Sequence, residues 1–192
     1  GHAVTGLTLS AAQLDFARAR LQGQGLNADL RLRDYRDERG TYDGVASIEM
    51  FEAVGEAYWP TYFDTLARCL KPGARACVQT IVIADALFDR YRRGTDFIQQ
   101  YIFPGGMLPS PRAFEEHAAR AGLEIVARLP FGRDYAITLA SWRTRFTARL
   151  EAVRALGFDE RFVRLWTFYL AYCEAAFAEG NTDVIQYTLR RR

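Results

Sequence analysis

Apolar residues form two kinds of pattern along the first third of the chain. Residues 3–9 are an apolar, β-branched run that predicts a strand, and Ser10 is a suitable N-cap for the amphipathic helix that follows. Residues 28–33 alternate polar and apolar side chains, which predicts a second strand. Residues 45–48 are expected to form a short, fully buried strand.

The same alternation of short and long apolar patterns continues to the C-terminus. A helix is predicted over 58–70, ended by the turn-forming residues 71–75, and a long apolar strand over 76–84. Alternating strands and helices favour parallel βαβ units, with helices on both faces of one sheet. The remaining predicted elements are a helix over 112–122, a strand over 123–130, long helices over 135–156 and 160–179, and a closing strand over 182–189.

One segment interrupts this alternation. Residues 85–111 are rich in aromatic residues, glycine and proline, and they include "DRYRRGTDFIQQYIFPGGMLPSP". Connections of this length inside a compact domain are usually functional loops or lids. We therefore expect this segment to cover a ligand site.

Composition narrows the class of protein. The 192 residues are enough for one domain with a sizeable core, and the net charge of +2 gives no indication of a nucleic-acid partner. Lys71 is the only lysine, which fits a GC-rich genome better than selection for phosphate binding. The three cysteines show neither metal-ligand nor disulfide spacing, which favours a reducing cytoplasm. Residues 1–2 resemble a tag remnant, so His117 stands alone and no metal site is expected.

Two carboxylates follow the strand predicted over 45–48. Carboxylates in this position commonly build a site, and here they are Glu49 and Glu52. For Glu52 the alternative is a carboxylate that only interacts favourably with a helix N-terminus. For Glu49 a hydrogen bond at the end of the strand is the favoured interpretation.

Several motifs occur together in a characteristic order. They are "VTGLTLSAAQLDFAR", "IEMFEAVGEAYWPTYF", "LKPGARACVQTI", "QQYIFPGGMLPS", "FGRDYAITLASWRTRF" and "FYLAYCEAAF…TDVIQYTL". Over residues 3–192 the chain resembles the C-terminal two-thirds of the cyclopropane-fatty-acyl-phospholipid synthases and mycolic acid cyclopropane synthases. The resemblance implies an α/β fold, a Rossmann-like class I methyltransferase sheet lacking its first βα unit. It also implies that residues 85–111 and 135–179 form lid and lipid-site elements.

The resemblance implies a set of catalytic residues. Glu52 and Tyr135 match the family residues that hold a bicarbonate ion, the base of the reaction, and Gln79 and Ile81 complete that set. Cys173 matches a cysteine assigned to the family active site, although its apolar surroundings favour a structural role.

The resemblance also implies S-adenosylmethionine as the methyl donor. The residues that match its ribose and adenine contacts are Thr8, Leu9, Gln13, Tyr35 and Ile48. The family's glycine-rich loop would precede residue 3, so we expect weak cofactor binding by this chain alone. Residues 3–9 and 45–48 should flank the first strand of the family, and either a homodimer or collapse of these strands would cover the free edges.

The implied activity is methylene transfer to the cis double bond of an unsaturated phospholipid acyl chain, which forms a cyclopropane fatty acid. Such an enzyme would be cytoplasmic and peripheral to the inner membrane. The family often has histidine where this chain has Ala53 and Gln79, so methylation without ring closure is an alternative. A non-catalytic methyltransferase-like binding subunit is a second alternative. A methyltransferase for a non-lipid substrate is disfavoured by the apolar lid segment.

Overall fold

The computed structural model describes all residues from 1 to 192. The strands are β1 (Thr5–Thr8), β2 (Asp29–Leu32), β3 (Tyr42–Ile48), β4 (Leu70–Ile83), β5 (Leu123–Pro130) and β6 (Thr182–Arg191). The α-helices are α1 (Ala11–Gly23), α2 (Trp59–Cys69), α3 (Asp85–Arg92), α4 (Phe97–Tyr101), α5 (Pro111–Arg120), α6 (Gly132–Thr147), α7 (Leu150–Ala155) and α8 (Glu160–Ala178). Three short 3₁₀ helices are η1 (Tyr35–Asp37), η2 (Phe51–Ala53) and η3 (Glu56–Tyr58).

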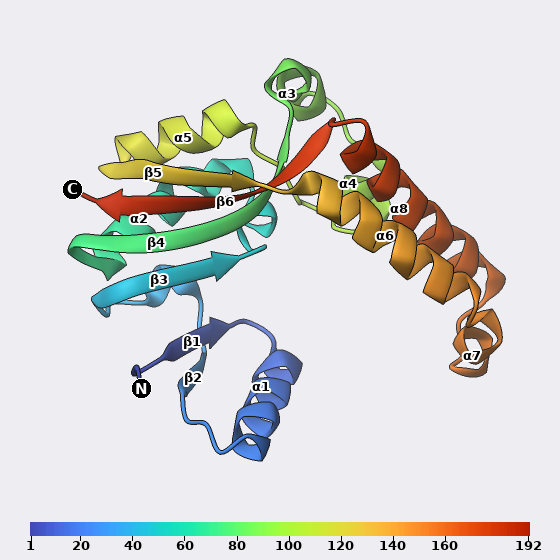
Figure 1. Cartoon of the computed structure of the whole chain (residues 1–192), viewed down its shortest axis with the longest axis horizontal. Coiled ribbons are helices and arrows are strands. Elements are labelled where there is room, and N and C mark those ends of the chain that lie inside the picture. The colour runs from blue at the N-terminus through green and yellow to red at the C-terminus, as the bar shows by residue number, and fades with distance from the viewer.

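The strands form two sheets. The larger sheet has the order β3-β4-β6-β5, with β3 parallel to β4 and β6 antiparallel to both of its neighbours. The smaller sheet pairs β1 with β2 in parallel, and α1 packs beside it (Figure 1). This is an α/β architecture with helices flanking a sheet, as the sequence predicted. The expectation of parallel strands in one sheet was wrong in part, because the strands form two sheets and β6 is antiparallel to its neighbours.

A cluster of buried aromatic side chains fixes the position of the segment that follows β3. Phe51, Phe63 and Phe114 are completely buried, and Phe114 stacks on Tyr187 of β6 with ring centroids 4.2 Å apart. Each such side chain contributes about 1.5–3 kcal/mol when removed from water. Because Phe51 is anchored in this core, its neighbour Glu52 has a fixed place beside the sheet.

The predictions of where helices begin and end were confirmed in part. Ser10 caps α1, since its hydroxyl accepts a hydrogen bond from the backbone N–H of Gln13. The helix predicted over 135–156 is wrong as one element, because it is broken between α6 and α7. Thr144 and Thr147 donate their hydroxyls to carbonyls one turn back, and such bonds bend and weaken a helix near its end.

Two expectations about strands were also wrong. The strand over 45–48 is not fully buried: Ile48 is 54% exposed, because β3 pairs on one side only, with β4. The turn expected over 71–75 lies within β4 instead. Tyr42 pairs with Leu70 but Gly44 pairs with Arg75, so the extra residues form an irregularity in the strand.

The two sheets remain separate, and β1 does not pair with β3. Collapse of these two strands onto each other was therefore a wrong expectation, and a homodimer stays a prediction. The buried carboxylate of Glu38 joins the units, since it accepts hydrogen bonds from Arg31, Arg33 and Tyr42. Arg68 of α2 donates to the Glu38 carbonyl. Polar contacts thus connect the β1–β2 unit to the larger sheet.

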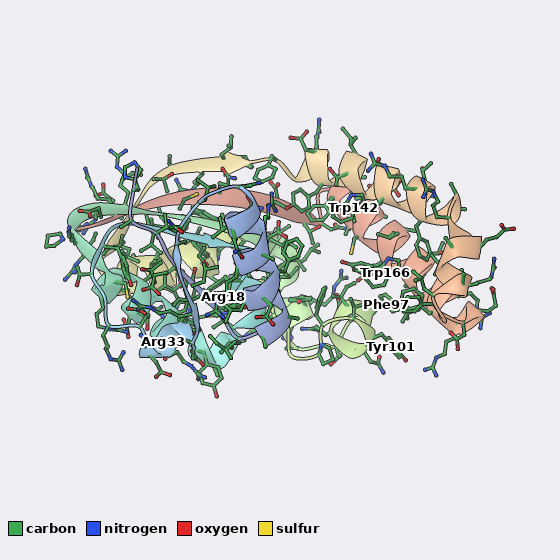
Figure 2. All side chains as sticks on the ribbon, turned by 90° about the horizontal axis from the view of Figure 1, so that it is seen from below. Arg18, Arg33, Phe97, Tyr101, Trp142 and Trp166 are labelled. Carbon is green, nitrogen blue, oxygen red and sulfur yellow. The ribbon has the colours of Figure 1, made fainter.

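The helices α6, α7 and α8 extend beyond the sheet as an arm (Figure 1). The short helix α4 lies against this arm, because the Phe97 and Phe168 rings are 4.6 Å apart in a T-shaped arrangement. Figure 2 shows Phe97 and Tyr101 on the same side of the molecule as Trp166 of α8. None of the helices combines the length and the apolar character that a membrane span requires.

Candidate active site

Glu49 ends β3 in an unusual backbone conformation. Its φ of 51° lies in the left-handed region, and no other residue except glycine has a positive φ. Its N–H donates to the Gln79 carbonyl of β4 at 2.9 Å. A non-glycine residue in this region costs about 1–3 kcal/mol, and such residues cluster at functional sites. The turn places Glu49 and Glu52 at the same end of the sheet.

Glu52 has one bonded and one unbonded carboxyl oxygen. Its Oε1 accepts the backbone N–H of Ile81 at 2.5 Å, whereas Oε2 is buried without a partner. Burial raises the pKa of Glu52, and the hydrogen bond from Ile81 opposes that shift. The backbone carbonyl of Glu52 also accepts the N–H of Met107, which joins η2 to the lid segment.

The carboxylate of Glu49 lies at the centre of a network of side-chain hydrogen bonds. The Tyr135 hydroxyl donates to Glu49 Oε1, and the Gln79 amide donates to the same oxygen at 2.7 Å. Gln186 of β6 donates to the Gln79 carbonyl oxygen at 2.8 Å, which fixes the orientation of the Gln79 amide. Burial and the neighbouring Glu49 raise the pKa of Tyr135, so its hydroxyl keeps its proton. Tyr135 therefore acts as a hydrogen-bond donor.

The residues expected to hold bicarbonate are already paired with one another. Tyr135 and Gln79 donate to Glu49, and the Ile81 N–H donates to Glu52. A bound bicarbonate would need these same donors. The site as it stands does not fit that ion, because carboxylates of the chain itself take its place.

A large cavity of about 880 Å³ opens beside the two carboxylates. Of its 28 lining residues 16 are hydrophobic, and this volume is within the range of small-molecule sites. Glu49 and Glu52 line one part, and the lid segment and α8 supply most of the rest. The aromatic lining residues are Tyr91, Phe103, Tyr169, Tyr172 and Phe177. Both segments assigned to the lid and lipid site thus contribute to one cavity.

Cys173 lies on α8 in the wall of this cavity. Burial raises the pKa of its thiol to about 12, and the nearby charge of Asp96 adds to that effect. At neutral pH the group is a thiol and not a nucleophilic thiolate. Its position supports a packing role.

The residues implied to contact the cofactor lie outside the cavity. The Thr8 hydroxyl donates to the Gln13 side chain at 2.7 Å, at the start of α1. Leu9 and Ile48 are exposed just after β1 and at the end of β3, strands that point the same way (Figure 1). Contact of these residues with S-adenosylmethionine stays a prediction.

Tyr35 differs from the other four. Its ring packs edge-on against Tyr62 of α2, with centroids 5.8 Å apart, and burial raises its pKa. Tyr35 is therefore partly committed to the core.

The hydrogen-bonding role expected for Glu49 at the end of the strand is confirmed, but sequence reasoning missed its partner Tyr135 and the role of Gln186. Gln186 lies opposite Gln79 in the β4–β6 pairing, and this register depends on residues more than 100 positions apart. The sequence did contain a signal for Glu49, because this glutamate directly follows a predicted strand and lies three residues before a second glutamate, Glu52. No group of three or more His, Cys, Asp or Glu side chains is placed to hold a metal ion.

Comparison of the sequence with known proteins identifies the family to which the chain belongs. Residues 1–187 match the family described as mycolic acid cyclopropane synthetase. The chain is 43% identical over 194 residues to tuberculostearic acid methyltransferase UfaA1 of Mycobacterium tuberculosis, covering 100% of this chain and 45% of that protein. It is 35% identical to cyclopropane-fatty-acyl-phospholipid synthase of Escherichia coli, covering 98% of this chain and 47% of that protein. The chain thus spans about half the length of these relatives.

A solved structure supports the same assignment. Mycolic acid cyclopropane synthase CmaA1, in a complex with SAH and CTAB, superposes with a TM-score of 0.88 at 26% identity. The match covers 98% of this chain and 70% of that one. The chain therefore belongs to the mycolic acid cyclopropane synthetase family of S-adenosylmethionine-dependent methyltransferases.

Proposed function

We propose that this chain carries the acyl-chain site of an enzyme that modifies the cis double bond of an unsaturated phospholipid. The methyl group comes from S-adenosylmethionine, and the product is a cyclopropane fatty acid. The observation that carries the proposal is the largely apolar cavity with Glu49 and Glu52 in its wall. An acyl chain needs such an apolar site, and the reaction needs a carboxylate beside the double bond.

The bound cofactor supplies an electrophilic sulfonium methyl group. When the double bond takes that methyl, a positive charge develops on the acyl chain. Phe103 and Tyr169, whose rings are 6.5 Å apart, line the cavity and can each stabilise a cation by about 0.5–2 kcal/mol. The apolar walls also keep water away from the cation, which would otherwise trap it as an alcohol.

Membrane contact forms part of the proposal. Trp142, Leu156 and Phe158 are exposed on the arm formed by α6 to α8, and side chains of this kind enter the interface of a bilayer. Arg149 lies in the same stretch of sequence and makes no ion pair within the chain, so its charge suits anionic headgroups, whereas Arg154 pairs with Glu160. We place the enzyme at the cytoplasmic face of the inner membrane, where it would reach phospholipid acyl chains.

A second product is favoured by one comparison and one residue. UfaA1, which is 43% identical to this chain, is named a methyltransferase for tuberculostearic acid and not a cyclopropane synthase. Gln79 is an amide that cannot carry a proton, in a position where the family often has histidine. Methylation of the acyl chain without ring closure is therefore the alternative reaction.

The test uses the full-length protein with S-adenosylmethionine that carries a trideuterated methyl group and with vesicles of an oleoyl phospholipid. Mass spectrometry of the released fatty acids then counts the deuterium atoms in the product. A cyclopropane that retains two of them supports the leading proposal. A methylene-branched acid without a ring, also with two, supports the alternative. Absence of label from every acyl chain would instead indicate a binding subunit without catalysis.

A further inference from the structure

We propose that Glu49 is the catalytic base that removes the proton from the methylated acyl cation. In this chain its carboxylate takes the position in which a bound bicarbonate was expected. The inference rests on the proposed function, because it assigns a residue to one step of that reaction.

The hydrogen-bond donors of the site converge on Glu49. The Tyr135 hydroxyl and the Gln79 amide both end on its Oε1, and Gln186 holds the Gln79 amide in that orientation. This arrangement leaves Oε2 of Glu49 to accept a proton. Glu49 also lines the cavity in which the acyl chain is proposed to lie.

The neighbouring side chains are less well placed to take a proton from the acyl chain. Gln79 has no site for a proton, and Tyr135 is a hydroxyl that keeps its own. Glu52 has one oxygen committed to the Ile81 N–H and the other buried without a partner. Glu49 is exposed in this chain, so a proton that it accepts has a route to solvent. The group that combines cavity contact with proton release is Glu49.

The backbone supports a role beyond ending a strand. A residue needed only for the left-handed turn would be glycine, which adopts a φ of about 51° without strain. Here Glu49 adopts this strained conformation instead and brings a carboxylate to the site. That carboxylate makes no ion pair and bonds only to neutral groups of the site.

The proposed step balances without any further reactant. The carbon–sulfur bond of the donor breaks as the double bond forms a new bond to the methyl carbon, which leaves a cation on the adjacent acyl carbon. Oε2 of Glu49 then takes one proton from the new methyl group. The electron pair of that carbon–hydrogen bond closes the cyclopropane ring onto the cationic carbon. In the alternative reaction a hydride first shifts from the methylated carbon to the adjacent cationic carbon, and the electron pair then forms a methylene double bond.

The experiment compares the full-length enzyme with its Glu49→Gln and Glu49→Gly variants in buffer freed of carbon dioxide. The wild type is expected to keep its turnover without bicarbonate, and Glu49→Gln to lose at least about 100-fold in kcat. Glu49→Gly relieves the strain and opens space beside Tyr135 and Gln79. We expect it to bind isotope-labelled bicarbonate, detected by nuclear magnetic resonance, and to regain turnover when that ion is added.

A matched control is Glu56→Gln, a glutamate of η3 that pairs with Arg92 outside the cavity. Its turnover should stay within about twofold of wild type, and all variants should keep their affinity for S-adenosylmethionine. Loss of wild-type turnover in bicarbonate-free buffer, or a Glu49→Gln variant as active as wild type, would overturn the proposal. Failure of the proposed function is separate, because then even the wild type would transfer no deuterated methyl group.

Discussion

The backbone N–H of Ile81 in β4 lies 2.5 Å from Oε1 of Glu52 in η2 and donates a hydrogen bond to it. This contact joins the end of one strand to the turn that follows its neighbour. The other oxygen of Glu52 is buried at the cavity without a partner. Glu52 is therefore held in one orientation in the cavity wall, where its carboxylate can stabilise a cation on a bound acyl chain.

The variant Glu52→Gln should fold normally and lose activity. Its amide oxygen still accepts the Ile81 N–H, but the amide nitrogen presents positive hydrogens to a developing cation. We expect turnover of the full-length enzyme to fall at least about 100-fold, which is about 2.7 kcal/mol. Affinity for S-adenosylmethionine, measured by calorimetry, should change little. Turnover within about tenfold of wild type would contradict this role for Glu52.

Replacing Cys173 by alanine should leave the chemistry intact. The thiol has a pKa of about 12 because it is buried, so no thiolate is available at neutral pH. We expect kcat within about threefold of wild type and a small loss of thermal stability from the space left on α8. Cys77→Ala, which changes a thiol outside the cavity lining, is the matched control. A loss of 100-fold or more in kcat for Cys173→Ala alone would restore this residue to catalysis.

Glu38 should make stability depend on acidic pH. Hydrogen bonds from the Gly40 N–H and the Tyr42 hydroxyl, with the charge of Arg31, lower the pKa of this buried carboxyl to about 2. Its contribution is full above the unfolded pKa of about 4.3 and is lost as the pH falls towards 2. Glu38→Gln should cost about 1.5–3 kcal/mol at pH 7 and flatten the stability curve below pH 5. Asp15→Asn on α1 is the control, and equal acid sensitivity of Glu38→Gln and wild type in denaturant titrations would refute the assignment.

Residues 1–192 alone are expected to bind S-adenosylmethionine weakly. Leu9 is 73% exposed and Ile48 is 54% exposed, so a ligand against them would keep much of its surface in water, unlike ligands in enclosed sites. Calorimetry should give a Kd above about 1 mM, a binding free energy weaker than about 4 kcal/mol. The full-length protein, assayed beside it, should bind more tightly. Micromolar binding by residues 1–192 would disprove the expectation.

The sequence was sufficient for the elements whose signals are local. The strand before Ser10, the capped helix after it and the apolar strand of β4 follow from hydrophobic spacing and capping within a few residues. The motif around Glu52 identified the family, because the motifs and their order lie in the linear chain. The break in the helix between α6 and α7 was harder to predict from the sequence. The hydrogen bonds that the threonine hydroxyls make to backbone carbonyls change the free energy of the helix only slightly.

Tertiary structure alone decided which groups meet. Glu49 and Tyr135 are 86 residues apart and Gln79 and Gln186 are 107 apart, and their contacts depend on the parallel β3–β4 and antiparallel β4–β6 registers. A shift of one residue in either register would turn these side chains to the opposite face of the sheet. Linear spacing therefore indicated two carboxylates, whereas the packing of the strands and α6 selected Glu49 as the partner of Tyr135.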